Sequence, residues 1–241
     1  MSSDLSTVAT LVNDFTEEYR IKMENAVEKY FTDEYFDSLG GPLAMMQKQF
    51  ASQAWREFYI GCLPPARQMT QIYEIGDPYF RDRDLIVGLG EQIRDEVKHA
   101  KIYANLSEQV GVPCDLAIWT DDNYDKLVAK CRLATEWEKP HHIAAGFQIS
   151  TEIVAAETSR RMGEYVEDEY PEIAKTLFDV TSDEGDHIHC GRLIVKRFAE
   201  EEDFDFDSEE EDVVDVEDED EDDIKLSKEK EEKERQKKLE E

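Results

Sequence analysis

Four apolar helical stripes in this 241-residue sequence each contain a glutamate, and this pattern constrains the fold more than any other feature. Apolar residues that recur at helical spacing predict a buried helix face. A carboxylate within such a face is costly unless it is paired or bound to a metal. The helices that carry these glutamates are therefore expected to pack around one shared polar centre. The glutamates are Glu57, Glu96, Glu152 and Glu184.

Two of the four stripes also carry a histidine one helical turn after the glutamate. His99 follows Glu96 and His187 follows Glu184, each by three residues, so each pair shares one helix face. The chain is so rich in acid that this spacing alone is weak evidence. Glu138 and His141 show it too, but Pro140 lies between them and indicates a helix start.

The periodicity predicts an all-α body, with almost no alternating run that would form a strand. Helices are expected over residues 5–36, 43–62, 81–110 and 140–166, and from Pro171 onward. The first of them is additional to the four that carry glutamates. A polar crossover helix is expected over residues 121–137, and a further turn or two after the break at Leu63-Pro64-Pro65.

Loop positions support this arrangement independently. Two residues at one height on antiparallel neighbours should be centred on the loop that connects them. The midpoint of Glu57 and Glu96 lies near residue 76, at Gly76-Asp77-Pro78, and that of Glu152 and Glu184 lies beside the break before Pro171.

The glutamate of the third stripe has a rival. Glu152 shares its face with small and apolar residues, whereas Glu157 lies among Arg160, Arg161 and Glu164, where a carboxylate is solvated or ion-paired. Glu152 is the favoured candidate, and Glu157 stays as the alternative.

Composition bounds the remaining possibilities. The net charge of −31 argues against nucleic acid binding through a general basic surface, and the acidic body suggests a halophilic, high-salt cytoplasm. Four cysteines without a Cys-x-x-Cys pair, no signal peptide and no long apolar run favour a cytoplasmic protein outside the membrane. From Glu200 to Asp223, 18 of 24 residues are acidic, which predicts a disordered tail over residues 200–241 after a helical domain over residues 1–199.

Four glutamates with two Glu-x-x-His turns form the ligand pattern of ferritin-like di-iron and di-manganese four-helix bundles. Three stretches sharpen the resemblance: Glu57-Phe58-Tyr59-Ile60-Gly61-Cys62-Leu63-Pro64, Asp95-Glu96-Val97-Lys98-His99-Ala100 and Asp183-Glu184-Gly185-Asp186-His187. Together they resemble the catalytic subunit of the bacterial multicomponent phenylacetyl-CoA ring epoxygenases, over roughly residues 42–198. This sequence differs in a longer segment between Glu57 and Glu96, in its acidic C-terminal region and in its unmatched N-terminal helix.

The resemblance implies a monooxygenase of the phenylacetate-catabolism type. It would use two iron ions, with manganese as the alternative at one or both positions, held by Glu57, Glu96, His99, Glu152, Glu184 and His187. Asp95 and Asp183 would each orient the histidine of the opposite motif. Dioxygen, a small organic substrate such as an aromatic acyl-CoA, and a reductase or other electron donor would be its partners, in a homodimer or a hetero-oligomer.

Other interpretations remain open. The same bundle could bind or oxidise iron without an organic substrate, or could be a non-catalytic partner subunit of an oxygenase complex. The glutamates and histidines could also form a buried polar network without metal. Trp55, Tyr59 and Tyr103 are interpreted as packing residues and Cys190 as a small core residue, while surface or capping positions are expected for His141, His142 and His189.

Overall fold

The computed structural model describes residues 4–114 and 137–199, which form helices joined by turns and loops, with no strand in these two ranges. The chain divides into two units, Met1–Glu201 and Glu202–Glu241, and all the described residues belong to the first. The all-α prediction is therefore confirmed for the described residues. The predicted crossover helix and the predicted acidic tail lie outside them.

The N-terminal region forms two helices where the sequence analysis expected one. α1 spans Asp4–Tyr30 and α2 spans Asp33–Ser38. The hydroxyl of Thr32 separates them, because it caps α2 by accepting a hydrogen bond from the Tyr35 backbone N–H at 3.2 Å. α1 buries Val8, Val12 and Val27 along one face.

The second predicted helix is longer than expected and contains a wide turn. α3 spans Gly41–Arg56, a π-helical segment η1 spans Glu57–Gly61, and α4 spans Leu63–Ile75. The prolines at 64 and 65 begin α4 instead of ending the helix, because a first-turn residue needs no backbone N–H partner within the helix. Leu43 has the helical spacing of the buried residues Met46 and Phe50, which predicts a buried position, but it is 45% exposed. Met45 and Met46 fill the core beside it.

The remaining helices match the prediction closely. α5 spans Arg83–Gln109, α7 spans Pro140–Ile143, a second π-helical segment η2 spans Ala144–Ile149, α8 spans Ser150–Val166, and α9 spans Pro171–Phe198. Pro140 begins α7, as the interrupted Glu138–His141 pair predicted.

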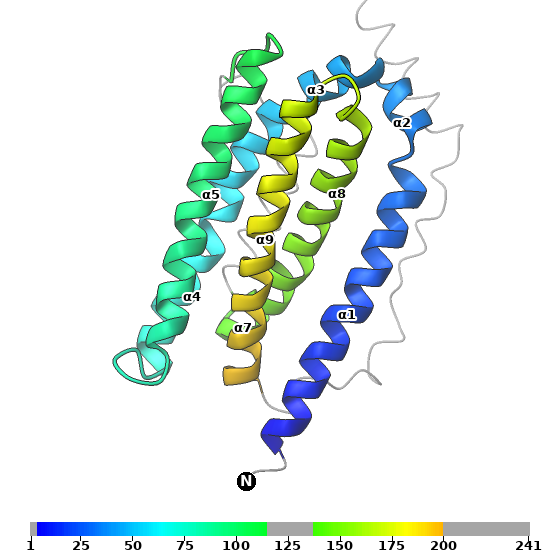
Figure 1. Ribbon diagram of the computed structural model, residues 1–241. Coiled ribbons are helices and arrows are strands. Elements are labelled where there is room, and N and C mark those ends of the chain that lie inside the picture. The colour runs from blue at the N-terminus through cyan, green and yellow to red at the C-terminus, as the bar shows by residue number, and fades with distance from the viewer. Residues whose placement is uncertain (1–3, 115–136, 200–241) are drawn as a thin grey trace, which may run out of the picture. The chain divides into compact units, whose positions relative to one another are not determined.

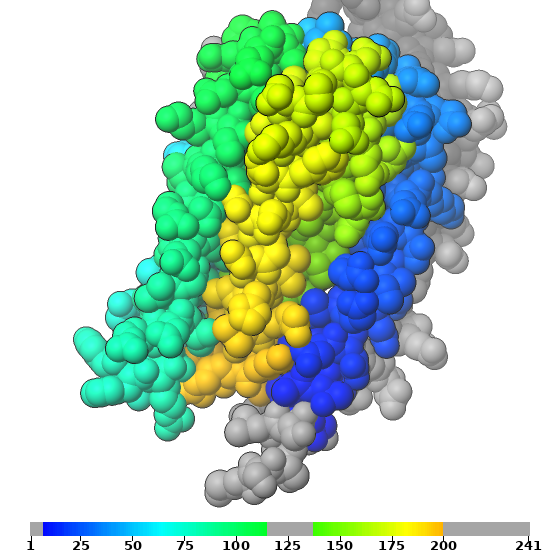
Figure 2. All heavy atoms as spheres, in the orientation of Figure 1, coloured from blue at the N-terminus to red at the C-terminus, as the bar shows by residue number. Residues whose placement is uncertain are grey.

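The helices lie side by side (Figure 1). α3 packs on α5, α5 on α9, and α9 on α8, while α1 covers α8 and α9. The space-filling view shows α5 and α9 next to each other on one face, with α1 beyond α9 (Figure 2). None of the described helices combines the length and apolar character needed to cross a bilayer.

Two apolar clusters flank a polar layer. The larger cluster joins α2, α3, α5, α8 and α9, and the smaller one joins η1, α7 and η2. On α3 and η1, Glu57 lies between residues of the two clusters, Ala54 and Ile60. The glutamate-bearing turns therefore lie between two apolar regions.

Candidate metal centre

The structure brings all six predicted donor residues together. Glu57 begins η1, Glu152 lies in the first turn of α8, and α5 and α9 each supply one glutamate and one histidine. Five of the six side chains are buried, and the side chain of Glu57 is 12% exposed. The buried group consists of Glu96, His99, Glu152, Glu184 and His187.

These residues form two overlapping groups of donor atoms. Glu57, Glu96 and His99 make one group, and Glu96, Glu152, Glu184 and His187 make the other. Within each group, one donor atom from every residue lies within 4.8 Å of the others. Because Glu96 belongs to both groups, the arrangement could hold two neighbouring ions.

The distances at the centre suit shared metal ligands. Nδ1 of His187 lies 2.7 Å from Oε2 of Glu184 and 3.4 Å from Oε1 of Glu96. Nδ1 of His99 lies 3.4 Å from Oε1 of Glu184 and 4.0 Å from Oε2 of Glu57. Metal bonds of about 2.1 Å place neighbouring donor atoms of one ion roughly 3 to 4 Å apart. Glu184 reaches both imidazoles, as a bridging carboxylate would.

Several of these buried atoms have no hydrogen-bond partner among the described residues. They are Nδ1 of His99, Nδ1 of His187 and Oε2 of Glu184; the 2.7 Å approach of the last two atoms does not have the angles of a hydrogen bond. Buried polar atoms are normally satisfied, so unpaired atoms that face one another need an explanation. A cation bound between them would supply one.

The electrostatics of the cluster also favour a cation. Burial, followed for each group by repulsion from a neighbouring carboxylate, raises the pKa of the four glutamates well above their usual range. Burial lowers the pKa of His99 and lowers that of His187 to about 4, so both imidazoles are neutral near pH 7. Four ionised carboxylates would carry a charge that two divalent cations neutralise.

The two histidines differ in their outer contacts. Asp183 lies 3.1 Å from Nε2 of His99 and accepts a hydrogen bond from Lys98 at 2.5 Å, so the predicted contact across the two motifs exists on this side. On the other side, Asp95 accepts hydrogen bonds from Arg94, and Nε2 of His187 has no hydrogen-bond partner among the described residues. No hydrogen bond joins Asp95 to His187, although the charge of Asp95 acts on this imidazole and opposes the lowering of its pKa by burial.

Three buried glutamines support the cluster, and the sequence analysis missed them. Gln68 donates to Gln148 at 2.7 Å, Gln148 donates to Gln92 at 3.1 Å, and Gln92 donates to Glu152 at 3.0 Å. Gln92 and Gln148 each lie four residues before a cluster glutamate, and that spacing was the available signal. The relay fixes the carboxylate of Glu152 from α4, η2 and α5.

Gly61 makes room for the shared carboxylate. A Cβ atom at this position would lie 2.3 Å from Oε2 and 2.6 Å from Cδ of Glu96. The carboxylate of Glu96 therefore lies directly against the backbone of η1. Any other residue at position 61 would displace it.

The structure also separates Glu152 from Glu157. Glu152 is 4% exposed and lies within the cluster. Glu157 accepts a hydrogen bond from Nε of Arg160 at 2.9 Å and lies outside the cluster. The geometry agrees with the preference for Glu152.

Of the other singled-out residues, Cys190 lies in the core as expected and one histidine departs from its expected position, whereas the packing interpretation of the three aromatic residues stays a prediction. Trp55 stacks on Tyr59, Tyr103 is fully buried next to Phe50, and Cys190 is buried. His142 and His189 are exposed, but His141 is buried, which corrects the expected surface position. It is covered because α9 and α4 both pack against α7, and Gln68 of α4 donates a hydrogen bond to the Pro140 carbonyl at 2.9 Å.

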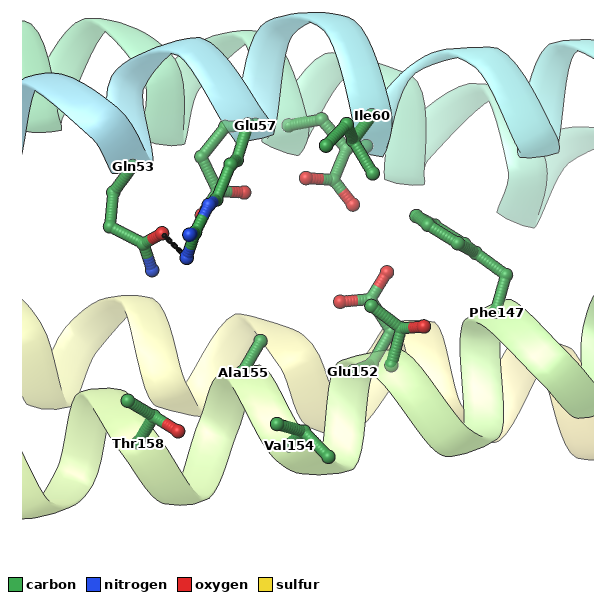
Figure 3. A pocket seen from close by; sticks show the side chains of 12 residues that line it. Gln53, Glu57, Ile60, Phe147, Glu152, Val154, Ala155 and Thr158 are labelled. Atoms are coloured by element: carbon green, nitrogen blue, oxygen red, sulfur yellow. Dashed lines mark hydrogen bonds between the residues drawn. The ribbon is translucent and has the colours of Figure 1, made fainter. Parts of the chain in front are cut away.

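A pocket of about 210 Å³ opens onto the cluster between α3–η1 and η2–α8. Glu57 and Ile60 face Glu152 and Phe147 across it (Figure 3). Val154 and Ala155 add apolar surface. Both π-helical segments line this pocket, and such wide turns occur frequently at functional sites.

No protein-family model, no curated protein and no solved structure matches this chain.

Proposed function

We propose that this chain is a di-iron oxidoreductase with a ferritin-like four-helix bundle, which activates dioxygen to oxygenate a small organic substrate. The observation that carries the proposal is the pair of overlapping donor groups that share Glu96. Carboxylates and imidazoles are ligands that suit iron and manganese. Manganese at one or both positions is the alternative metal.

The six residues divide naturally between two ions. Glu57 and His99 would help to hold one ion, Glu152 and His187 would help to hold the other, and Glu96 and Glu184 would serve both. This division follows from the shared membership of Glu96 and from the approach of Glu184 to both imidazoles. The relay through Gln92 would keep Glu152 in its ligating orientation.

Two bound iron ions would supply the reduction of dioxygen. In the overall reaction, substrate, dioxygen, two electrons and two protons give the oxygenated substrate and one water. The electrons would come from a reductase or another donor protein in the cytoplasm, within a homodimer or hetero-oligomeric complex. The apolar walls of the pocket would bind the substrate and exclude water beside Glu57 and Glu152.

The pocket suits the reactive part of a larger molecule. Its volume of about 210 Å³ accommodates a small apolar group, such as the ring of an aromatic acyl-CoA. The exposed Arg56 also lines the pocket and offers a positive charge to an anionic remainder of the substrate. This combination supports the resemblance to the phenylacetyl-CoA epoxygenases.

Iron oxidation without an organic substrate is the second candidate. A groove lined by carboxylates reaches the cluster between α5 and α9, as expected of a protein that takes up iron as its substrate. The presence of all six donor residues in one cluster argues against the third interpretation, a partner subunit without metal.

Metal analysis of the purified protein, combined with optical spectra, tests the proposal. We expect about two iron or manganese ions per chain and a spectral change when the reduced protein meets dioxygen. Continued uptake and oxidation of Fe(II) beyond two ions would favour the second candidate. Failure to bind iron, manganese or cobalt under reducing conditions would exclude both.

A further inference from the structure

The groove between α5 and α9 is distinct from the apolar pocket, and its lining combines apolar side chains and Arg94 with four carboxylates that lie outside the metal centre. Its volume is about 560 Å³. Asp84, Glu91 and Asp95 contribute carboxylates from α5, and Asp186 contributes one from α9. The three acids on α5 are seven and four residues apart, so they follow one helix face toward the cluster. α5 and α9 lie side by side on the face shown in Figure 2.

The inner end of the groove is the imidazole of His187. This side chain is 2% exposed, lines the groove, and has no hydrogen-bond partner for Nε2 among the described residues. Its Nδ1 atom lies 2.7 Å from Glu184. Because the two ring nitrogens point in different directions, Nε2 is directed away from that carboxylate.

The other imidazole lacks this freedom. Nε2 of His99 is held by Asp183 at 3.1 Å, and Lys98 fixes Asp183 in turn. Asp95 precedes Glu96 as Asp183 precedes Glu184, yet it accepts a hydrogen bond from Arg94, and Nε2 of His187 has no hydrogen-bond partner among the described residues. One histidine is therefore anchored from outside, whereas the other presents an unpaired nitrogen to an acidic groove.

We propose that this groove is the loading route for divalent cations, with Asp95 and Asp186 binding the incoming ion beside Nε2 of His187. Carboxylates attract and bind hard divalent cations, and an acidic groove raises their local concentration. The apolar pocket is a poorer route, because, among the described residues, its only charged lining residue outside the proposed ligands is Arg56. In the groove, four carboxylates outnumber the single arginine, Arg94. This inference rests on the proposed metal centre.

The test measures the rate of metal uptake separately from the amount bound. Metal-free protein is mixed with Co(II) in a stopped-flow instrument, and the visible absorbance of bound cobalt is followed. The groove variant carries Asp95→Asn and Asp186→Asn. The control variant carries Glu108→Gln and Glu172→Gln, which removes equal charge from exposed positions on the same two helices outside the groove.

We expect the groove variant to take up cobalt about tenfold more slowly than the wild type, because it loses the electrostatic attraction that raises the association rate. Two cobalt ions should still be bound at the end. The control variant should load at nearly the wild-type rate. A second variant, Asp84→Asn with Glu91→Gln, changes only exposed residues and should load about threefold more slowly. It decides the question if the first variant does not fold.

Three results would overturn the loading route. Groove variants could load at the wild-type rate, the control could slow equally, or the groove variant could bind fewer ions at equilibrium, which would make Asp95 or Asp186 part of the centre itself. A wild-type protein that binds no cobalt would instead reject the proposed metal centre, and the route with it.

Discussion

At the scale of single residues, the cluster combines donor atoms that would repel one another without a cation. Glu96 and Glu184 are each 2% exposed or less, and burial holds the pKa of both carboxyl groups well above the usual range. The position of the cluster carboxylates depends on the space that neighbouring residues leave as well as on hydrogen bonds. Two predictions separate a metal centre from a merely buried polar network.

The first prediction compares the two glutamates of α8. Glu152→Gln keeps the shape and can still accept a hydrogen bond from Gln92, but it removes a charged donor, so metal affinity should fall by at least about a hundredfold. Glu157→Gln only weakens the ion pair with Arg160, at a cost of about 0–1 kcal/mol in stability. Metal titration of both variants checks this. Metal loss in Glu157→Gln alone would reverse the assignment on α8.

The second prediction concerns the space at Gly61. In Gly61→Ala the new methyl group must push the Glu96 carboxylate aside, so both ions should bind at least about tenfold more weakly while the helices persist. Gly90→Ala is the matched control, because its Cβ would have no neighbour within 4 Å. The control should be more stable by up to about 1 kcal/mol, with unchanged metal binding. Calorimetric titration measures the metal affinity, and thermal unfolding followed by circular dichroism measures the stability. Wild-type metal affinity in Gly61→Ala would show that the space at Gly61 does not position the Glu96 carboxylate.

At the scale of elements, one ion pair with a buried carboxylate joins a turn between two helices to the end of a third helix. The turn between α4 and α5 is tied to the end of α9 through Asp82. Its fully buried carboxylate accepts hydrogen bonds from the Asp77 backbone N–H and from Arg197, both at 2.6 Å. This contact lies outside the metal cluster, so it can be tested without disturbing the ligands.

The third prediction is that Asp82→Asn destabilises the metal-free protein by about 1–3 kcal/mol at pH 7. Burial works to raise the pKa of Asp82, but Arg197 and the Asp77 N–H outweigh it, so the pKa lies below 3.8. The stabilisation from the ionised carboxylate is complete above 3.8 and is lost as the pH falls through the folded pKa. Urea unfolding at several pH values should show the difference from wild type shrinking in acid.

The control for this prediction is the exposed ion pair between Lys175 and Asp179, whose side chains are 70% and 68% exposed. Asp179→Asn should change stability by no more than about 1 kcal/mol at any of these pH values. If Asp82→Asn were equally mild at pH 7, the contact between the α4–α5 turn and α9 would not stabilise the fold.

At the scale of the whole molecule, the cluster couples metal binding to folding. The native protein without metal keeps protons on buried carboxyl groups that the unfolded chain releases above about pH 4.5. His187 acts in the opposite direction between about pH 4 and 6.5, because the native imidazole stays neutral while the unfolded one is protonated. Above pH 6.5 only the carboxyl contribution remains.

The fourth prediction is that metal-free protein loses stability as the pH rises from 6.5, while metal-loaded protein does so much less. The loss should reach up to about 1.4 kcal/mol per pH unit for each excess proton that the native state holds. Each bound ion should add about 2.7 kcal/mol at a free concentration one hundred times its Kd. Urea unfolding with and without a chelator measures this. A metal-free protein whose stability is constant from pH 6.5 to 9 would contradict it.

Local patterns determined a large part of this protein. Helical spacing placed Glu96 with His99 and Glu184 with His187, and proline located the starts of α7 and α9. Such features depend on residues within one or two turns, so the sequence alone was sufficient to predict them. Helical spacing did not predict burial where burial depends on whether another helix covers the residue. Leu43 is exposed and His141 is buried, each against expectation.

Tertiary structure alone decided which groups meet across helices. The relay from Gln68 through Gln148 and Gln92 joins three elements, and Asp183 reaches His99 while its counterpart Asp95 turns to Arg94. Periodicity tells which way a side chain faces along its own helix. It does not tell the distance and rotation between helices, and these set every contact in the cluster, the pocket and the groove.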